Sequence, residues 1–211
     1  RQIEEISRGD IQEFGNELLI SGGIKASGLA PKTVNSILSV AKNVFKYASD
    51  EKGLRVVDIK SISVKQPQKP LRVLSLHEQK KFSAYLRENL SPCNLGILLC
   101  LYTGLRIGEI CALKWMDIYF TEQYLYVHQA MQRIQLLDGS EKKTEVRVSE
   151  PKSNCSIRRI PIPDEMLLLL SSSRKTDDAF ILTGMVHRFI EPRCMENHFK
   201  AAVEACELKG V

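Results

Sequence analysis

The chain has 211 residues, enough for one domain or two small ones, and a 44% hydrophobic share that is ordinary for a packed core. Its formal charge of +5 permits a nucleic-acid partner without requiring one. Its apolar runs are too short to span a bilayer and no signal peptide is recognisable, so we expect no membrane partner.

The first third of the chain predicts a small helical unit. Asp10 is a candidate N-cap for a first helix, and the glycines within 22–28 predict a loop after it. Pro31 suits the first turn of a second helix, whose apolar stripe is Val34, Ile37, Leu38, Ala41, Val44, Phe45 and Ala48. Three basic residues lie off that stripe, namely Lys32, Lys42 and Lys46. A proline- and lysine-rich stretch over 60–72 then predicts a linker.

The remaining residues predict helices around one small sheet. Helix starts are indicated at a Ser75–Glu78 capping box, at Ser91-Pro92, at Asp164 and at Pro192. Short strands are indicated over 124–127, 146–148 and 157–162. The sequence therefore predicts a mainly α protein with a small antiparallel β-sheet, in two lobes.

Basic residues gather in two segments of the chain. Residues 25–69 hold nine basic and three acidic residues, and residues 142–159 hold six and two. Two such segments suit contact with a polyanion at two places, although charge clusters this modest are more commonly two solvated surfaces. The six cysteines form no C-x-x-C pair and show no metal-ligand spacing with the four histidines, so we expect no metal site. Scattered thiols are typical of proteins in the reducing cytoplasm.

The segment LYTGLRIGEICALKW, residues 101–115, places Arg106 and Glu109 three positions apart in an apolar run. A partly buried guanidinium needs a partner, and Glu109, one helical turn away, can hold it and leave part of its fork free. A held, permanently charged fork suits bidentate recognition of a phosphate. The spacing alone is equally consistent with a structural ion pair on a core helix.

The longer string TGLRIGEICALKWMDI, residues 103–118, resembles the first arginine box of the tyrosine recombinases, the phage integrase family. It is most similar to integrases of phages and conjugative transposons. The string PKSNCSIRRIPIP, residues 151–163, resembles the β-hairpin of that family. The resemblance implies a helical, SAM-like core-binding DNA-binding domain over 1–66, a linker over 67–72, and the N-terminal part of the catalytic domain over 73–211.

The resemblance also implies a site-specific DNA recombinase that cuts and rejoins DNA through a 3′-phosphotyrosine intermediate, without a metal or other cofactor. Arg106 matches the first phosphate-clamping arginine, Glu109 its supporting acid, and Lys152 the hairpin lysine that acts as general acid. The residues expected to contact DNA are Lys32, Lys42, Lys46, Arg158 and Arg159. The last two alternate on a strand, so at most one can face the active site, and both are interpreted as backbone contacts or surface.

The 211 residues contain no H-x-x-R box and no tyrosine after Tyr126. By the family pattern, we expect a chain truncated before the second arginine and the tyrosine nucleophile. It would bind double-stranded DNA as a monomer without cleaving it, whereas the full-length protein would act as a tetramer on DNA to integrate or excise a mobile element. The alternative is a non-catalytic DNA-binding regulator or decoy derived from an integrase. A helical interaction protein with no nucleic-acid role is disfavoured by the arginine box.

Overall fold

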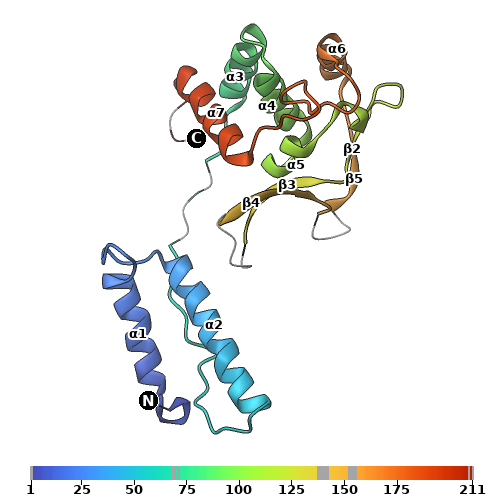
Figure 1. The fold of residues 1–211 in the computed structure, drawn as a ribbon. Helices are drawn as coiled ribbons and strands as arrows, with labels where there is room; N and C mark the ends of the chain where they lie inside the picture. Colours follow the sequence, from blue (N-terminus) through green and yellow to red (C-terminus); the bar gives the residue numbers. More distant parts are fainter. Residues whose placement is uncertain are drawn as a thin grey trace. The chain divides into compact units, whose positions relative to one another are not determined.

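The computed structural model describes residues 2–67, 70, 72–136, 143–151, 156–208 and 210. Its internal contacts divide the chain into two compact units, residues 1–71 and 72–211 (Figure 1). Helices predominate and the strands form small antiparallel sheets, which confirms the predicted fold class. Within the described residues, no helix combines the length and apolarity needed to cross a membrane.

The first unit is built on two helices, α1 (Arg8–Ser21) and α2 (Pro31–Asp50), after a 3-10 turn, η1 (Ile3–Glu5). The predicted cap at Asp10 is wrong, because Ser7 is the N-cap of α1. The Asp10 backbone N–H donates to the Ser7 hydroxyl at 3.2 Å, and the Ser7 N–H donates to the Asp10 carboxylate at 2.8 Å. Asp10 is therefore the third residue of the helix and the acidic partner of Ser7 in a reciprocal capping box.

The core of the first unit lies between the two helices and the extended segment that follows them. It consists of Ile11, Val34, Leu38, Phe45, Ile59 and Ile62. Asn35 ties α2 to that segment, because its side-chain amide both donates to the Val64 carbonyl and accepts the Val64 N–H, at 2.8 Å each. Val44, expected in the apolar stripe, is 51% exposed. Helix α1 and the extended segment together cover a narrower face of α2 than the apolar stripe predicts, and Val44 lies outside the covered face.

The second unit packs its helices around two sheets. The helices are α3 (Leu76–Glu88), α4 (Pro92–Thr103), α5 (Ile107–Ala112), α6 (Asp164–Ser173) and α7 (Pro192–Ala205), with a 3-10 turn η2 (Trp115–Asp117). The strands are β1 (Ile118–Tyr119), β2 (Tyr124–Val127), β3 (Ala130–Gln135), β4 (Thr144–Ser149) and β5 (Arg158–Pro161). One sheet has the order β1-β2-β5 and the other is the β3-β4 pair, all antiparallel. The single predicted sheet is therefore two, and β3 was missed because its sequence does not alternate cleanly.

Local signals place most helix starts of this unit correctly. The Ser75–Glu78 capping box opens α3, and Ser91 caps α4. The predicted cap at Asp164 is wrong, because Pro163 is the N-cap of α6 and Asp164 is its first residue. The Asp164 carboxylate instead accepts a hydrogen bond from the Gln123 side-chain amide at 2.9 Å.

Two glycines set the position of the short helix α5. Gly104 ends α4 in the left-handed conformation, with φ of +67°, and turns the chain toward α5. Gly108, inside α5, lies against β3, where an added Cβ would be 2.7 Å from the Met131 carbonyl oxygen. The absence of a side chain at 108 therefore allows α5 to pack closely on the β3-β4 sheet.

Candidate active site

Arg106 is the N-cap residue of α5, with an extended backbone at φ −75° and ψ 153°. Its backbone N–H donates to Glu109 Oε2 at 2.9 Å, and its Nη1 donates to Glu109 Oε1 at 2.9 Å. The Glu109 side chain is 3% exposed, whereas that of Arg106 is 70% exposed. The carboxylate thus holds one corner of the guanidinium and leaves the rest of its fork free, as the spacing predicted. The expected partial burial of Arg106 is wrong, because only the carboxylate of the pair is buried.

Arg158, the first residue of β5, is the second partner of Glu109. Its Nη1 donates to Oε1 at 2.9 Å and its Nη2 donates to Oε2 at 2.8 Å, so the contact is bidentate. Arg158 Nη1 also donates to the Ser156 carbonyl at 3.0 Å. This pair has no local signal in the sequence. Alternation on the strand indicated that one of Arg158 and Arg159 could face inward, but nothing local identified a carboxylate 49 positions away.

The cluster of Arg106, Glu109 and Arg158 carries a net charge of one positive unit, because two guanidinium groups share one carboxylate. Burial raises the pKa of Glu109, but hydrogen bonds from Arg158 and Arg106 outweigh it and lower that pKa to about 2. The hydrogen bond to Glu109 raises the pKa of Arg158. Glu109 is therefore ionised at neutral pH. The positive charge that this carboxylate does not neutralise lies on the exposed guanidinium of Arg106.

The other predicted site residues are not part of this cluster, or are not among the residues that the structure describes. Arg159 is exposed, with its guanidinium 5.1 Å from the ring centroid of Tyr124. Lys152 lies outside the described residues. In the first unit, Lys32 and Lys46 are exposed and Lys42 is partly buried on α2. Lys42, Lys46 and Lys60 line a shallow hollow of about 230 Å³. The proposed roles of these residues in DNA contact stay predictions.

Two histidines have structural partners that the sequence did not indicate. His128 Nε2 lies 2.9 Å from Oδ1 of Asp117, a buried carboxylate whose other oxygen accepts the Lys114 backbone N–H at 2.9 Å. His198 Nε2 lies 3.0 Å from Oδ1 of the buried Asn94. The first contact joins residues 11 positions apart, whereas the second ties α7 to α4 across 104 positions.

The described cysteines and acidic residues offer no metal centre. No group of three or more potential metal ligands occurs among the residues that the structure describes. Cys93, Cys100, Cys111, Cys194 and Cys206 are free thiols. Burial raises the pKa of both Cys100 and Cys111 to about 12, which favours the protonated thiol over the reactive thiolate.

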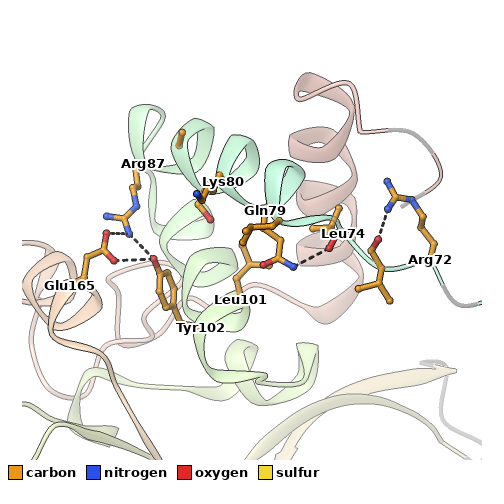
Figure 2. Close-up of a pocket in the computed structure, with 12 residues that line it drawn as sticks. Arg72, Leu74, Gln79, Lys80, Arg87, Leu101, Tyr102 and Glu165 are labelled. Atoms are coloured by element: carbon orange, nitrogen blue, oxygen red, sulfur yellow. Dashed lines mark hydrogen bonds and ion pairs between the residues drawn. The ribbon is translucent and has the colours of Figure 1, made fainter.

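A separate hollow of about 850 Å³ is lined by α3, α4, α6 and the segment before α3 (Figure 2). At one side of it, Arg87 Nη2 donates to the Tyr102 hydroxyl at 2.8 Å and to Glu165 Oε1 at 2.5 Å. The Tyr102 hydroxyl donates to Glu165 Oε2 at 3.2 Å. Its lining includes none of the arginines of the cluster, so this hollow is not part of the candidate site.

The cluster on α5 and β5 supplies positive charge and oriented N–H donors to solvent. Arg106 has five N–H donors, and within the part of the chain that the structure describes the side chain of Glu109 occupies one of them. The remaining donors can bind an oxyanion such as a phosphodiester. The cluster itself contains no nucleophile, so its chemistry is to bind and stabilise negative charge.

Residues 67–204 match the model of the phage integrase family, which is more than half of the chain. The chain is 28% identical over 182 residues to a XerC-like tyrosine recombinase of Caldanaerobacter subterraneus, covering 82% of this chain and 44% of that protein. It is 27% identical over 187 residues to the ICEBs1 integrase of Bacillus subtilis, covering 88% and 47%. The chain thus spans less than half the length of these two relatives.

Two solved structures share the fold. A Tn1549 transposon integrase in complex with transposon right end DNA has a TM-score of 0.73 at 19% identity, covering 100% of this chain and 67% of that one. A lambda integrase in a tetramer bound to a Holliday junction has a TM-score of 0.65 at 18% identity, covering 98% and 55%. The matched family model, with the arginine box at the N-terminus of α5, leads to one conclusion: the chain belongs to the phage integrase family.

Proposed function

We propose that this chain is the DNA-binding part of a site-specific tyrosine recombinase, an integrase that moves a mobile element by cutting and rejoining double-stranded DNA. The observation that carries the proposal is the Arg106–Glu109–Arg158 cluster, which holds an exposed guanidinium at the position matched by the arginine box of the family. The names of the related proteins support the partner, because the Tn1549 and lambda integrases were solved with DNA.

In the proposed reaction, a tyrosine hydroxyl attacks the scissile phosphate, a 3′-phosphotyrosine forms and the 5′-oxygen leaves. Arg106 stabilises the negative charge that builds on the non-bridging oxygens, a contribution of about 3 kcal/mol or more by analogy with a lost oxyanion donor. Lys152 protonates the leaving oxygen as general acid, a role usually worth about 10²–10⁴-fold in rate. No cofactor takes part in these steps.

The 211 residues hold no H-x-x-R box and no tyrosine after Tyr126. We propose that they bind duplex DNA without cleaving it, as a monomer, and that the whole protein works as a tetramer on DNA in the cytoplasm. An incubation with nicked suicide duplexes, followed by a denaturing gel, tests the first point. A protease-sensitive covalent protein–DNA band would contradict it, because it would reveal a nucleophile among these residues.

The binding proposal is tested by fluorescence anisotropy with a duplex of about 30 base pairs, titrated at several salt concentrations. Because bound Lys and Arg release counterions, the logarithm of the association constant should fall linearly with the logarithm of the salt concentration, by about 0.9 for each phosphate contacted. An affinity that does not change with salt, or no binding at low salt, would remove the nucleic-acid function.

The proposed DNA face of the first unit is tested by charge reversal. Lys42→Glu and Lys46→Glu on α2 should each weaken binding, because each removes a phosphate contact and adds a repulsive charge. Lys200→Glu on α7 is the control, since Lys200 Nζ is bound to Glu196 at 2.5 Å along that helix. Equal losses for α2 and α7 variants would contradict the assignment.

A further inference from the structure

We propose that Arg158 is a positioning residue for Arg106. It acts by filling the hydrogen-bond capacity of Glu109, so that the Arg106 guanidinium stays free to bind a phosphate. The inference rests on the proposed function and extends it, because it assigns Arg158 a task inside the protein in addition to any contact with DNA.

A carboxylate offers about four acceptor positions, two on each oxygen. Oε1 of Glu109 accepts Nη1 of Arg106 and Nη1 of Arg158, both at 2.9 Å. Oε2 accepts the backbone N–H of Arg106 at 2.9 Å and Nη2 of Arg158 at 2.8 Å. All four positions are therefore occupied, and Arg158 supplies two of the four donors.

This occupancy limits Arg106 to a single side-chain bond with Glu109. A guanidinium beside a lone carboxylate normally takes it with two parallel N–H···O bonds. Here the second position is held by Arg158, whose side chain is 29% exposed against 70% for Arg106. The better buried arginine makes the fork-to-fork contact, and the exposed one keeps its outer donors for a ligand.

The charges lead to the same conclusion. Glu109 and Arg158 neutralise one another, so the charge of Arg106 attracts a phosphate at nearly full strength. Without Arg158, Arg106 would be the only counter-charge in the cluster for the buried carboxylate. The remaining Arg106–Glu109 pair would then have a net charge close to zero. The loss of net charge and the loss of unoccupied N–H donors would both weaken the binding of Arg106 to a DNA phosphate.

Arg158 also connects α5 with the backbone just before β5. Its Nη1 donates to the Ser156 carbonyl at 3.0 Å. The same side chain therefore fixes the carboxylate that orients Arg106 and the backbone at the start of β5.

The test is a double-mutant cycle on DNA affinity with the 211-residue chain. Arg106→Gln should weaken duplex binding about tenfold in the wild-type background, as expected for one lost charge-assisted bond to a phosphate. In the Arg158→Gln background it should weaken binding by less than about twofold, because Glu109 has already captured Arg106.

Arg159→Gln is the matched control. It removes the same charge from the next residue of the same strand, but Arg159 lies on the exposed face against Tyr124. In that background, the tenfold effect of Arg106→Gln should persist. An equal effect of Arg106→Gln in all three backgrounds would overturn the inference and leave Arg158 with a purely structural role.

Two further measurements keep the inference testable. Arg158→Lys retains the charge but cannot span both oxygens, so it should give an intermediate effect even if Arg158→Gln does not fold. NMR of the Arg106 guanidinium reports its bonding directly, and rotation about its Cζ–Nε bond should slow in both Arg158 variants. If wild type fails to bind DNA, the proposed function falls, whereas the guanidinium signal still decides the inference: unchanged rotation in the variants refutes it.

Discussion

The substitution Glu109→Gln tests how much the arginine cluster contributes to the fold. The charged carboxylate has a pKa of about 2 in the folded protein against an ordinary value of 4.5. At 1.36 kcal/mol for each pH unit, this difference is worth about 3 kcal/mol of unfolding free energy at neutral pH. Glutamine also leaves the guanidinium of Arg158, whose side chain is 29% exposed, without its counter-charge. We therefore expect Glu109→Gln to lower the free energy of unfolding by about 3 kcal/mol.

The pH dependence of stability has a defined sign. Because the folded-state pKa lies below the unfolded value, the contribution of Glu109 is fully present above about pH 4.5 and is lost as the pH falls toward 2. The stability of wild type should therefore fall more steeply across that interval than the stability of Glu109→Gln. The two curves should converge at the acid end.

The assay is urea unfolding at a series of pH values, followed by the fluorescence of Trp115. It is the single tryptophan of the chain and is 2% exposed in the core of the second unit, so it reports this unit. Glu196→Gln is the control, because Glu196 accepts from an arginine three positions earlier, as Glu109 does, but is 39% exposed. It should have a much smaller effect. A loss below about 1 kcal/mol for Glu109→Gln, or parallel pH curves, would refute the reasoning.

Two other substitutions test the packing that supports the site. Gly108→Ala should destabilise the second unit by about 1–3 kcal/mol, because the added Cβ would be 2.7 Å from the Met131 carbonyl oxygen and the backbone must shift. An unchanged midpoint of urea unfolding would contradict the close packing of α5 on β3. Tyr102→Phe should lower the free energy of unfolding by about 0.5–1.5 kcal/mol, because the hydroxyl bridges Arg87 and Glu165. An unchanged midpoint in a thermal melt would contradict a stabilising bridge.

The sequence predicted the features that local chemistry determines. Capping residues and prolines placed the starts of α3, α4 and α7, and aromatic and β-branched residues placed β2. The two wrong caps, Asp10 and Asp164, are acidic residues inside the first turn, where they favour a helix start as much as an N-cap does. Local signals therefore located these helices to within a few residues.

The features that were missed depend on contacts between distant segments. Strand β3 exists because it pairs with β4 and supports α5, although its sequence carries a weak strand signal. Arg106 and Glu109 were predicted together because they lie one helical turn apart. The bidentate contact of Arg158 with Glu109 joins α5 to β5, and only the fold brings these two elements together.

The most direct test of the central claim compares Arg106→Gln with Arg174→Gln in the salt dependence of duplex binding. Arg174 also pairs with an acid three positions later, Asp177 at 2.9 Å, and its replacement removes the same charge. If the Arg106 guanidinium contacts a phosphate, its loss should reduce the slope of log affinity against log salt by about 1, whereas the Arg174 variant should retain the wild-type slope. Identical slopes for wild type and both variants would contradict the account.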